Sequence, residues 1–374
     1  MLQDRVDSNE YSTWSNTFQH SVDFLQDSTR WNDLPPSDLF ALAFILLSRY
    51  EEYLPFIGDK HGRFTSDSSL LKKSDLLQVP IVDSILLWFS TYVNVKFGVT
   101  IELKQLKKTD LTFDIDHLWK YQHKSTIVTF GGYLKDLFKL DFSSIKERRK
   151  TLKASSLIDS YDLSRWEKYI DFYQTTFFVL MNNRTQYDKG ISPSHPAFVS
   201  AIQKLVETSD VGIHPGYQTS ESLTQMTSQI ETFQSIVNAV PIKSRQHYLR
   251  LKFPTTYRLL IESGIKEDYS LGYADDIGYR AGTCRPFLWF DLESNAETPL
   301  NLLPFAAMDV TLLNYLSLSP SEALSAMKNL INSAARVEGT CRLIWHNSNP
   351  FWEDTWAPYL QSFLLFTPSN EDLN

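Results

Sequence analysis

Two aspartates, Asp114 and Asp116, lie two residues apart at the end of a short apolar stretch. The alternation of apolar and polar residues over 111–115 predicts a short β-strand. Residues i and i+2 of a strand point to the same face, so the two carboxylates would share a face with Thr112. Two negative charges that close require a cation or a shared proton. The stretch therefore indicates a metal or acid–base site. The alternative is a strand end at which one Asp caps the next helix and the other is solvated.

Strands and helices alternate after residue 110, which predicts an α/β fold with a parallel sheet. The expected strands cover residues 111–114, 176–180, 211–214, 248–251, 268–270, 287–290 and 341–345. The expected helices cover residues 133–138, 196–207, 223–240, 255–263 and 320–336. This pattern is typical of a barrel or a doubly wound sheet, in which functional residues gather at the carboxyl ends of the strands.

Histidines accompany the ends of several expected strands. His117 and His214 follow the first and third, His346 follows the last, and His247 precedes the fourth. One histidine at a strand end is usually structural, but several of them together with an aspartate pair indicate a shared site. Mixed aspartate and histidine ligands suit zinc or a similar divalent ion.

The composition excludes several classes of function. A net charge of −8 and a pI near 5.5 argue against a general nucleic-acid or anionic-membrane surface. The two cysteines, Cys284 and Cys341, have no paired spacing and predict neither a disulfide scaffold nor a thiolate zinc site. No apolar run reaches the roughly 18 residues of a membrane helix. The first residues lack a basic segment followed by an apolar one, so no signal peptide and a cytoplasmic location are expected.

The first part of the chain, residues 1–107, is expected to form a separate domain. Ser37 or Asp38 is a suitable N-cap for an apolar helix over 39–47, and a second helix is expected over 80–97. A basic, polar stretch precedes residue 110 and marks the expected boundary.

This first segment contains no cluster of histidines and carboxylates, so it is expected to contribute no catalytic group. Glu51 and Glu52 are expected to pair with Arg49 or Arg63 rather than to act in catalysis.

The order of motifs after residue 110 resembles the polysaccharide deacetylases, also called carbohydrate esterase family four or the NodB-homology fold. The residues that carry the resemblance are 112–116, 212–217, 244–248, 268–283 and 343–347. The resemblance implies a distorted (β/α) barrel over residues 108–374. The segment before it resembles the uncharacterised domain that precedes such deacetylases in some bacterial proteins.

The resemblance also implies roles for four residues. Asp114 matches the catalytic base and His346 the catalytic acid, while Asp116 and His214 match metal ligands. Arg245 or Arg280 is expected to hold the base ionised, since a guanidinium beside a carboxylate favours its charged form.

The sequence departs from the family at the remaining metal ligand. The second histidine of the metal motif should fall at Gln218, and His247 occupies a position where the family usually has a proline. His247 or His117 is therefore expected to supply the missing ligand from another strand, and His247 completes the expected set.

The expected function is a metal-dependent hydrolase that removes acetyl groups from an N- or O-acetylated oligo- or polysaccharide, with zinc as the expected ion. Tyr217, Tyr273 and Trp345 are candidates for stacking on a sugar ring, with core packing as the alternative. One alternative function is a hydrolase of another C–N bond, such as that of a small cyclic amide. The other is a glycan-binding or scaffold protein that has lost metal chemistry, which Gln218 favours and the retained aspartates and histidines oppose.

Overall fold

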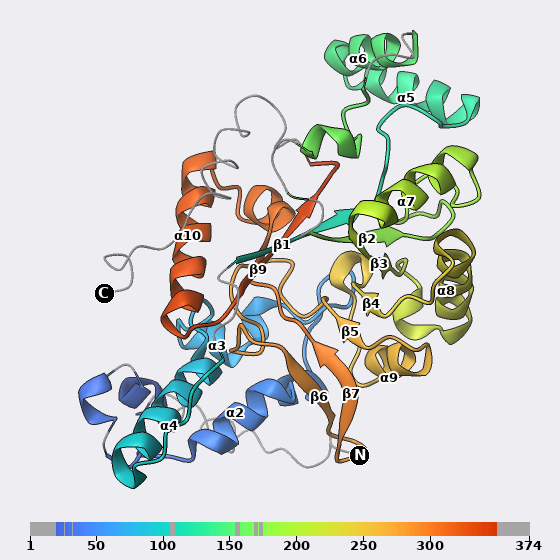
Figure 1. Cartoon of the computed structure of the whole chain (residues 1–374). Helices are drawn as coiled ribbons and strands as arrows, with labels where there is room; N and C mark the ends of the chain where they lie inside the picture. Colours follow the sequence, from blue (N-terminus) through green and yellow to red (C-terminus); the bar gives the residue numbers. More distant parts are fainter. Residues whose placement is uncertain are drawn as a thin grey trace.

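A nine-stranded sheet forms the centre of the computed structural model, which describes residues 20–25, 27–31, 33–104, 109–153, 158–167, 171 and 175–349 (Figure 1). The strand order is β6-β7-β5-β4-β3-β2-β1-β9-β8, and every described pair is parallel except β6 with β7. The strands are β1 (Thr109–Ile115), β2 (Thr176–Leu180), β3 (Asp210–His214), β4 (Lys243–Ser244), β5 (Glu267–Asp268), β6 (Phe287–Asp291), β7 (Ala296–Leu302), β8 (Ala307–Met308) and β9 (Cys341–His346).

The chain that follows β7 closes this sheet into a distorted barrel. The N–H groups of Leu303 and Phe305 donate to the carbonyls of Asp268 and Leu271, at 2.8 and 3.1 Å. The next N–H, that of Ala306, donates to the carbonyl of Arg342 in β9 at 2.8 Å. Residues 303–306 thus connect the β5 side of the sheet to the β9 side. The expected α/β barrel architecture is confirmed.

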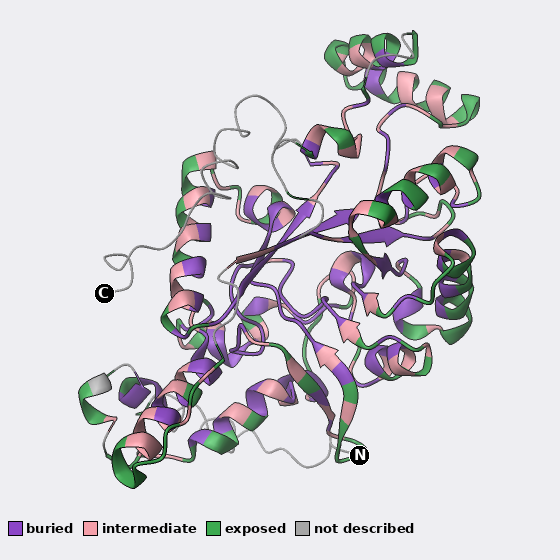
Figure 2. Ribbon diagram, viewed as in Figure 1, coloured by how far each residue is buried: buried purple, intermediate pink, exposed green. Residues whose placement is uncertain are grey.

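Helices cover the outside of the barrel, with α7, α8 and α9 along one side and α10 along the other (Figure 1). Figure 2 shows the central strands β1, β2, β3 and β9 largely buried and the outer faces of these helices exposed. The helices of this part of the chain are α5 (Thr126–Phe138), α6 (Phe142–Lys153), α7 (Pro196–Thr208), α8 (Leu223–Val237), α9 (Thr255–Glu262) and α10 (Pro320–Arg336). Local signals define several of these ends: Ser319 and Glu322 form a capping box at α10, and Pro196 begins α7.

Successive side chains of a strand point alternately to the outside and to the inside of the barrel. The outward side chains are apolar and several of the inward ones are polar. Phe113, Phe177 and Leu343 point outward into the main core beneath the helices. Thr112 and Asp114 point inward instead, where both contact a buried arginine from the segment after β4. The period of two along β1 therefore delivers both core residues and site residues from one strand.

Gly212 in β3 shows how tightly the barrel interior is packed. A Cβ at this position would lie 2.7 Å from the ring of Phe178 and 2.9 Å from the carbonyl oxygen of Lys243. Only glycine fits there, because neither the buried ring nor the backbone can move away at low cost.

The N-terminal region contains α2 (Leu39–Leu47), α3 (Leu70–Lys73) and α4 (Ile81–Phe97), which share an apolar cluster of their own. Asp38 caps α2 as expected, accepting from the N–H groups of Phe40 and Ala41. The expected domain boundary at residues 107–108 lies outside the described residues, so the division into two domains stays a prediction.

Buried charges join this region to the barrel. Glu52 accepts from Arg49 at 2.8 Å and from Nε of Arg280 at 2.9 Å, and all three side chains are buried. The expected pairing of Glu51 and Glu52 with Arg49 is confirmed. The contact surface is close-fitting: Gly278 has a φ of 139°, and a Cβ there would lie 2.1 Å from the carbonyl oxygen of Leu77.

Three features differ from the expectation. Residues 248–251 do not form a strand; His247–Leu249 is a 3-10 turn in which Tyr248 has a φ of 61°, and the strand at this place is the two-residue β4. The alternation that predicted a strand is therefore coincidental. Helix α5 begins at Thr126, seven residues before the expected start, because Ser125 caps it and two glycines are tolerated inside it. Strands β7 and β8 and helix α6 were not expected; β7 is largely polar and β8 has only two residues.

Within the described residues, no helix is both long and apolar enough to cross a bilayer.

Candidate metal-binding site

The candidate site lies at the carboxyl ends of β1, β3 and β9. Strands β1 and β9 are neighbours, and their register places Asp114 directly opposite His346. Strand β3 ends at His214, and the segment after β4 brings in Arg245 and His247. Parallel strands bring residues distant in sequence to one edge in this way.

Asp116, His214 and His247 form the group suited to a metal ion, with one ligand atom from each within 4.8 Å of the others. Nε2 of His214 lies 3.4 Å from Oδ1 of Asp116, and Nε2 of His247 lies 3.6 Å from the same oxygen. Oδ1 of Asp116 is buried and accepts no hydrogen bond. A buried carboxylate oxygen without a donor is costly unless a cation compensates it, so the donor set fits a divalent ion with mixed nitrogen and oxygen ligands.

Hydrogen bonds on the far side of each ring orient the two histidines. Nδ1 of His214 donates to the backbone carbonyl of Arg245, and Nδ1 of His247 donates to Oδ1 of Asp188 at 2.6 Å. A carbonyl or carboxylate oxygen only accepts, so the proton of each neutral ring lies on Nδ1. The lone pair of each Nε2 is then directed at Asp116, which is the arrangement that metal-binding histidines use.

His346 is oriented by a third carboxylate. Its Nδ1 lies 2.6 Å from Oδ1 of Asp309, and its backbone N–H donates to Oδ2 of the same residue at 2.8 Å. Nε2 of His346 then faces the site, 3.9 Å from Oδ2 of Asp114. A histidine held at one nitrogen and open at the other is suited to proton transfer.

Asp114 is fixed by a buried arginine. Oδ1 accepts from Nη1 of Arg245 at 2.7 Å, while Nη2 of that arginine donates to Thr112 and its Nε to the carbonyl of Tyr269. The guanidinium also lies 4.4 Å above the ring of Phe178. Oδ2 remains directed at the site, 3.9 Å from Nε2 of His214.

The charges of the site determine its protonation. Burial raises the pKa of Asp116, but the positive charge of His247 and the nearby imidazoles outweigh burial and hold this pKa well below its ordinary range. Burial lowers the pKa of His247, and the carboxylates of Asp116 and Asp188 outweigh it, so that the pKa rises to about 9. Burial lowers the pKa of His346, but the carboxylate of Asp309 outweighs burial and raises this pKa to about 10. His346 is therefore protonated at neutral pH.

A pocket of about 370 Å³ opens above these residues. Tyr187 and Tyr248 line one part of its wall, and Tyr217 stacks on Tyr187 with ring centroids 3.9 Å apart. Arg63, from the N-terminal region, also lines the pocket. It is held by Asp59, by the carbonyl of Tyr248 at 2.9 Å and by the hydroxyl of Tyr315 at 2.9 Å.

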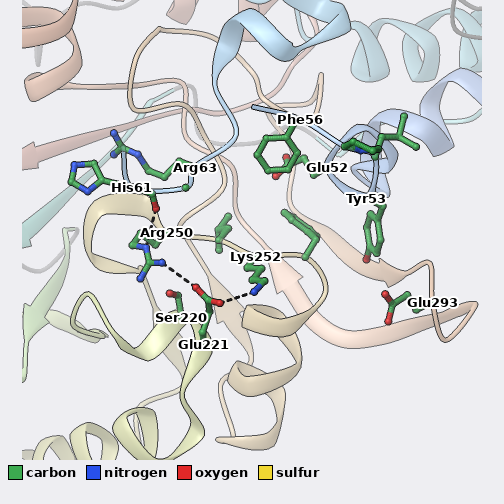
Figure 3. Close-up of a pocket in the computed structure, with 15 residues that line it drawn as sticks. Glu52, Tyr53, Phe56, His61, Arg63, Ser220, Glu221, Arg250, Lys252 and Glu293 are labelled. Carbon is green, nitrogen blue, oxygen red and sulfur yellow. Dashed lines mark hydrogen bonds and ion pairs between the residues drawn. The ribbon is translucent and has the colours of Figure 1, made fainter. Parts of the chain in front are cut away.

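A second cavity of about 730 Å³ is lined in part by the turn that carries His61 and Arg63 (Figure 3). Arg63 lines both cavities. Figure 3 shows that Arg250 and Lys252 both point at Glu221, with contacts of 3.0 and 2.6 Å. Arg250 and Lys252 thus share one carboxylate, and the candidate catalytic groups lie in the smaller pocket.

The structure brings together the residues expected at the site and excludes others. Arg245, and not Arg280, pairs with Asp114; Arg280 instead binds Glu52. Gln218 precedes a 3-10 turn and is not part of the pocket wall, and His247 lies where a third ligand is needed.

The other expected contacts are placed as follows. His117 lines the pocket but is not part of the three-residue group. Tyr273 and Trp345 are buried in the apolar cores, so their expected stacking on a sugar ring is wrong. The N-terminal segment supplies Arg63 to the pocket wall, and the expectation that it contributes no catalytic group stays a prediction.

Sequence reasoning missed Asp188 and Asp309, the carboxylates that orient His247 and His346. Asp309 directly follows β8, so a search for acidic residues after every short apolar stretch would have found it. Asp188 lies in a loop after β2, where no pattern distinguishes it from other polar residues.

Residues 2–98 match a family of unknown function (DUF7033). No curated protein matches the chain. Among solved structures, a protein named as a polysaccharide deacetylase from Mycobacterium smegmatis is 15% identical with a TM-score of 0.45, over 71% of this chain and 85% of that one. An allantoinase is 13% identical with a TM-score of 0.41, over 69% and 83% of the two chains. A polysaccharide deacetylase from Bacillus cereus is 12% identical with a TM-score of 0.31, over 70% and 87%. These values are too low to assign an activity.

Proposed function

We propose that this protein is a metal-dependent hydrolase that removes acetyl groups from an N- or O-acetylated glycan, with zinc as the expected ion. One observation carries the proposal. Asp114 and His346 face each other at 3.9 Å on adjacent strands, beside the three-residue group Asp116, His214 and His247. A base, an acid and a set of metal ligands thus converge on one small volume, as hydrolysis of an amide or ester requires.

Each residue has a role that its surroundings support. A divalent cation bound by Asp116, His214 and His247 would lower the pKa of a water and polarise the substrate carbonyl. Asp114, held by Arg245 at 2.7 Å, accepts the proton from the attacking water through its free Oδ2. His346, protonated beside Asp309, donates to the leaving amine or alcohol.

The pocket favours a polar, ring-shaped substrate of modest size. Its volume of about 370 Å³ is within the range of small-ligand sites. Aromatic side chains and hydrogen-bonding groups line it together, a combination that suits the apolar faces and hydroxyls of a sugar.

The test is acetate release from N-acetylglucosamine oligomers and from acetylated xylan, using protein purified without chelator and supplied with zinc. Asp114→Ala and His346→Ala should each reduce the rate by roughly 10²–10⁴-fold while metal stays bound, the usual range for a proton-transfer group. Asp67→Ala, an exposed aspartate outside the site, is the matched control. Undiminished activity in both site variants would contradict the mechanism.

Two further measurements separate the alternatives. Hydrolysis of a cyclic amide without release of acetate from either glycan would contradict the glycan assignment. Retention of metal by wild-type protein without turnover of any substrate would instead identify a binding protein.

A further inference from the structure

Helices α5 and α6 form a helical hairpin (residues 126–153) that projects from the barrel (Figures 1 and 2). One face of α5 is apolar and exposed to solvent: Ile127 is 83% exposed, Phe130 64%, Leu134 41%, Leu137 52% and Phe138 87%. These residues follow one another at intervals of three or four, or adjoin at the end of the helix, so they lie on one side of it. In a helix that belongs to a protein core, this side would be buried.

The polarity of the hairpin is reversed with respect to a normal helical pair. The two helices are held together by Asp136 and Arg148, a buried ion pair at 2.7 Å. The guanidinium of Arg148 also lies 5.3 Å from the ring centre of Tyr133, and a Cβ on Gly132 would meet it at 2.5 Å. Charged groups therefore form the inner contact, while the large apolar side chains point outward. No described residue covers them.

The loop between the helices and the start of α6 extend the apolar surface. Leu140 and Phe142 are exposed, as is Leu152 near the end of α6. Such a concentration of exposed apolar side chains on one projecting element indicates an interaction surface.

Basic residues lie on the same hairpin as this apolar surface. Six exposed cations lie on the hairpin and form no ion pair with a described residue: Lys135, Lys139, Lys146, Arg149, Lys150 and Lys153. Residues 126–153 contain seven basic and three acidic residues, in a chain whose net charge is −8. Two of those acids are occupied, Asp136 by Arg148 and Glu147 by Lys120. The overall negative charge thus conceals a local positive cluster.

We propose that the helical hairpin binds the surface of an anionic lipid bilayer. Exposed phenylalanine and leucine on one side, with lysine and arginine around them, are the features of an interfacial helix that inserts its apolar face at the headgroup boundary. Anionic headgroups supply the charge that the six unpaired cations lack. A second copy of the chain packed face to face would bring like charges together, and a soluble polyanion would leave the apolar side chains in water.

The test is sedimentation of the full chain with vesicles of phosphatidylcholine alone or with 30% phosphatidylglycerol. Binding to the anionic vesicles should be at least about tenfold tighter than to the neutral ones and should weaken with added salt. Phe138→Glu and Arg149→Glu should each weaken it about tenfold or more, whereas Val95→Glu, at a site 65% exposed on α4, should leave it unchanged. Equal affinity for the two kinds of vesicle, or equal binding by wild type and both hairpin variants, would overturn the proposal.

A second measurement examines the hairpin in the absence of lipid. Both native cysteines are buried, so a polarity-sensitive thiol dye attaches selectively to Phe138→Cys. Its emission should indicate water in buffer and shift to the blue on anionic vesicles. Blue emission in buffer that persists on dilution would mean that another part of the chain covers this face. Blue emission that disappears on dilution would mean that a second copy of the chain covers it. Either result would overturn the proposal. Neither measurement depends on the metal or on hydrolysis.

Discussion

Oδ1 of Asp309, the residue that follows the short strand β8, lies 2.6 Å from Nδ1 of His346, the last residue of the neighbouring strand β9. This contact fixes which nitrogen of the ring faces Asp114. It also sets the charge of the ring, because the pKa of His346 rises to about 10 although burial alone would lower it. His346 is thereby kept protonated at neutral pH, the state that its proposed role as the acid requires.

The first prediction concerns the pH dependence of the reaction. His346 carries its proton below its pKa, so the wild-type rate should fall only at pH well above neutral, as the pH approaches about 10. Asp309→Asn removes the largest of the charges that raise this pKa, to which Asp116 and Asp114 also contribute, and should shift the alkaline limb of the pH–rate profile to lower pH.

The matched control is Asp188→Asn, which alters the carboxylate behind His247 instead. This variant should weaken metal binding by roughly 10–100-fold and leave the alkaline limb in place. An unchanged limb in Asp309→Asn would contradict the role of Asp309.

The second prediction is that metal binding releases a proton. The pKa of His247 is raised to about 9, so the ring is protonated at pH 7.5, whereas a metal ligand must be neutral. Calorimetric titration with zinc in two buffers of different ionisation enthalpy should show release of about one proton at pH 7.5. The release should decline near pH 10. A binding enthalpy independent of the buffer at pH 7.5 would contradict this protonation state.

The third prediction is that metal occupancy depends on Asp116. Asp116→Ala removes the oxygen toward which both ligand histidines point, at 3.4 and 3.6 Å. Elemental analysis should find little metal in this variant and near-stoichiometric metal in wild type and in Asp309→Asn. Equal occupancy in wild type and Asp116→Ala would remove this residue from the ligand set.

The fourth prediction tests the contribution of the N-terminal region to the pocket. Arg63→Ala removes a side chain that lines the pocket and holds both the carbonyl of Tyr248 and the hydroxyl of Tyr315. It should reduce kcat/KM by about tenfold, mainly through KM, since Arg63 forms no contact with Asp114 or His346, the proposed proton-transfer pair, among the described hydrogen bonds and ion pairs. Arg336→Ala at the end of α10 is the control. A rate equal to wild type would show that Arg63 does not contribute to substrate binding.

The fifth prediction concerns stability. Glu52→Gln leaves Arg280 buried without a carboxylate and Arg49 with Glu51 alone, at 3.4 Å, and should lower the free energy of unfolding by about 3–5 kcal/mol. The exposed variant Glu297→Gln should change it by less than about 0.5 kcal/mol. Chemical denaturation compares the two, and similar midpoints would refute the importance of this contact.

The pKa of Glu52 determines how its contribution to the free energy of unfolding depends on pH. Burial would raise the pKa of Glu52, but Arg280 and Arg49 outweigh it and lower the pKa below its ordinary value of 4.5. Its contribution is therefore complete above pH 4.5 and is lost as the pH falls through the lowered folded-state pKa. Between pH 5 and 7, Glu52 itself should add no pH dependence to the unfolding of the wild type.

Local patterns in the sequence were sufficient for much of the barrel. The alternation over 111–115 predicted β1 and placed Asp114 and Asp116 near one face, and the apolar runs of β2 and β9 were found almost to the residue. Signals of this kind are contained in a few consecutive residues, because strand period and helix capping depend only on neighbours along the chain.

The tertiary structure alone decided which distant groups meet. Arg245 rather than Arg280 reaches Asp114, and His247 rather than His117 joins Asp116 and His214 in the candidate metal-binding group. The carboxylates that orient the histidines lie 59 and 37 positions away from them in the sequence, on loops whose local composition is ordinary. Their partners are set by the curvature of the sheet and by where each strand ends, and neither property is encoded in a short stretch of sequence.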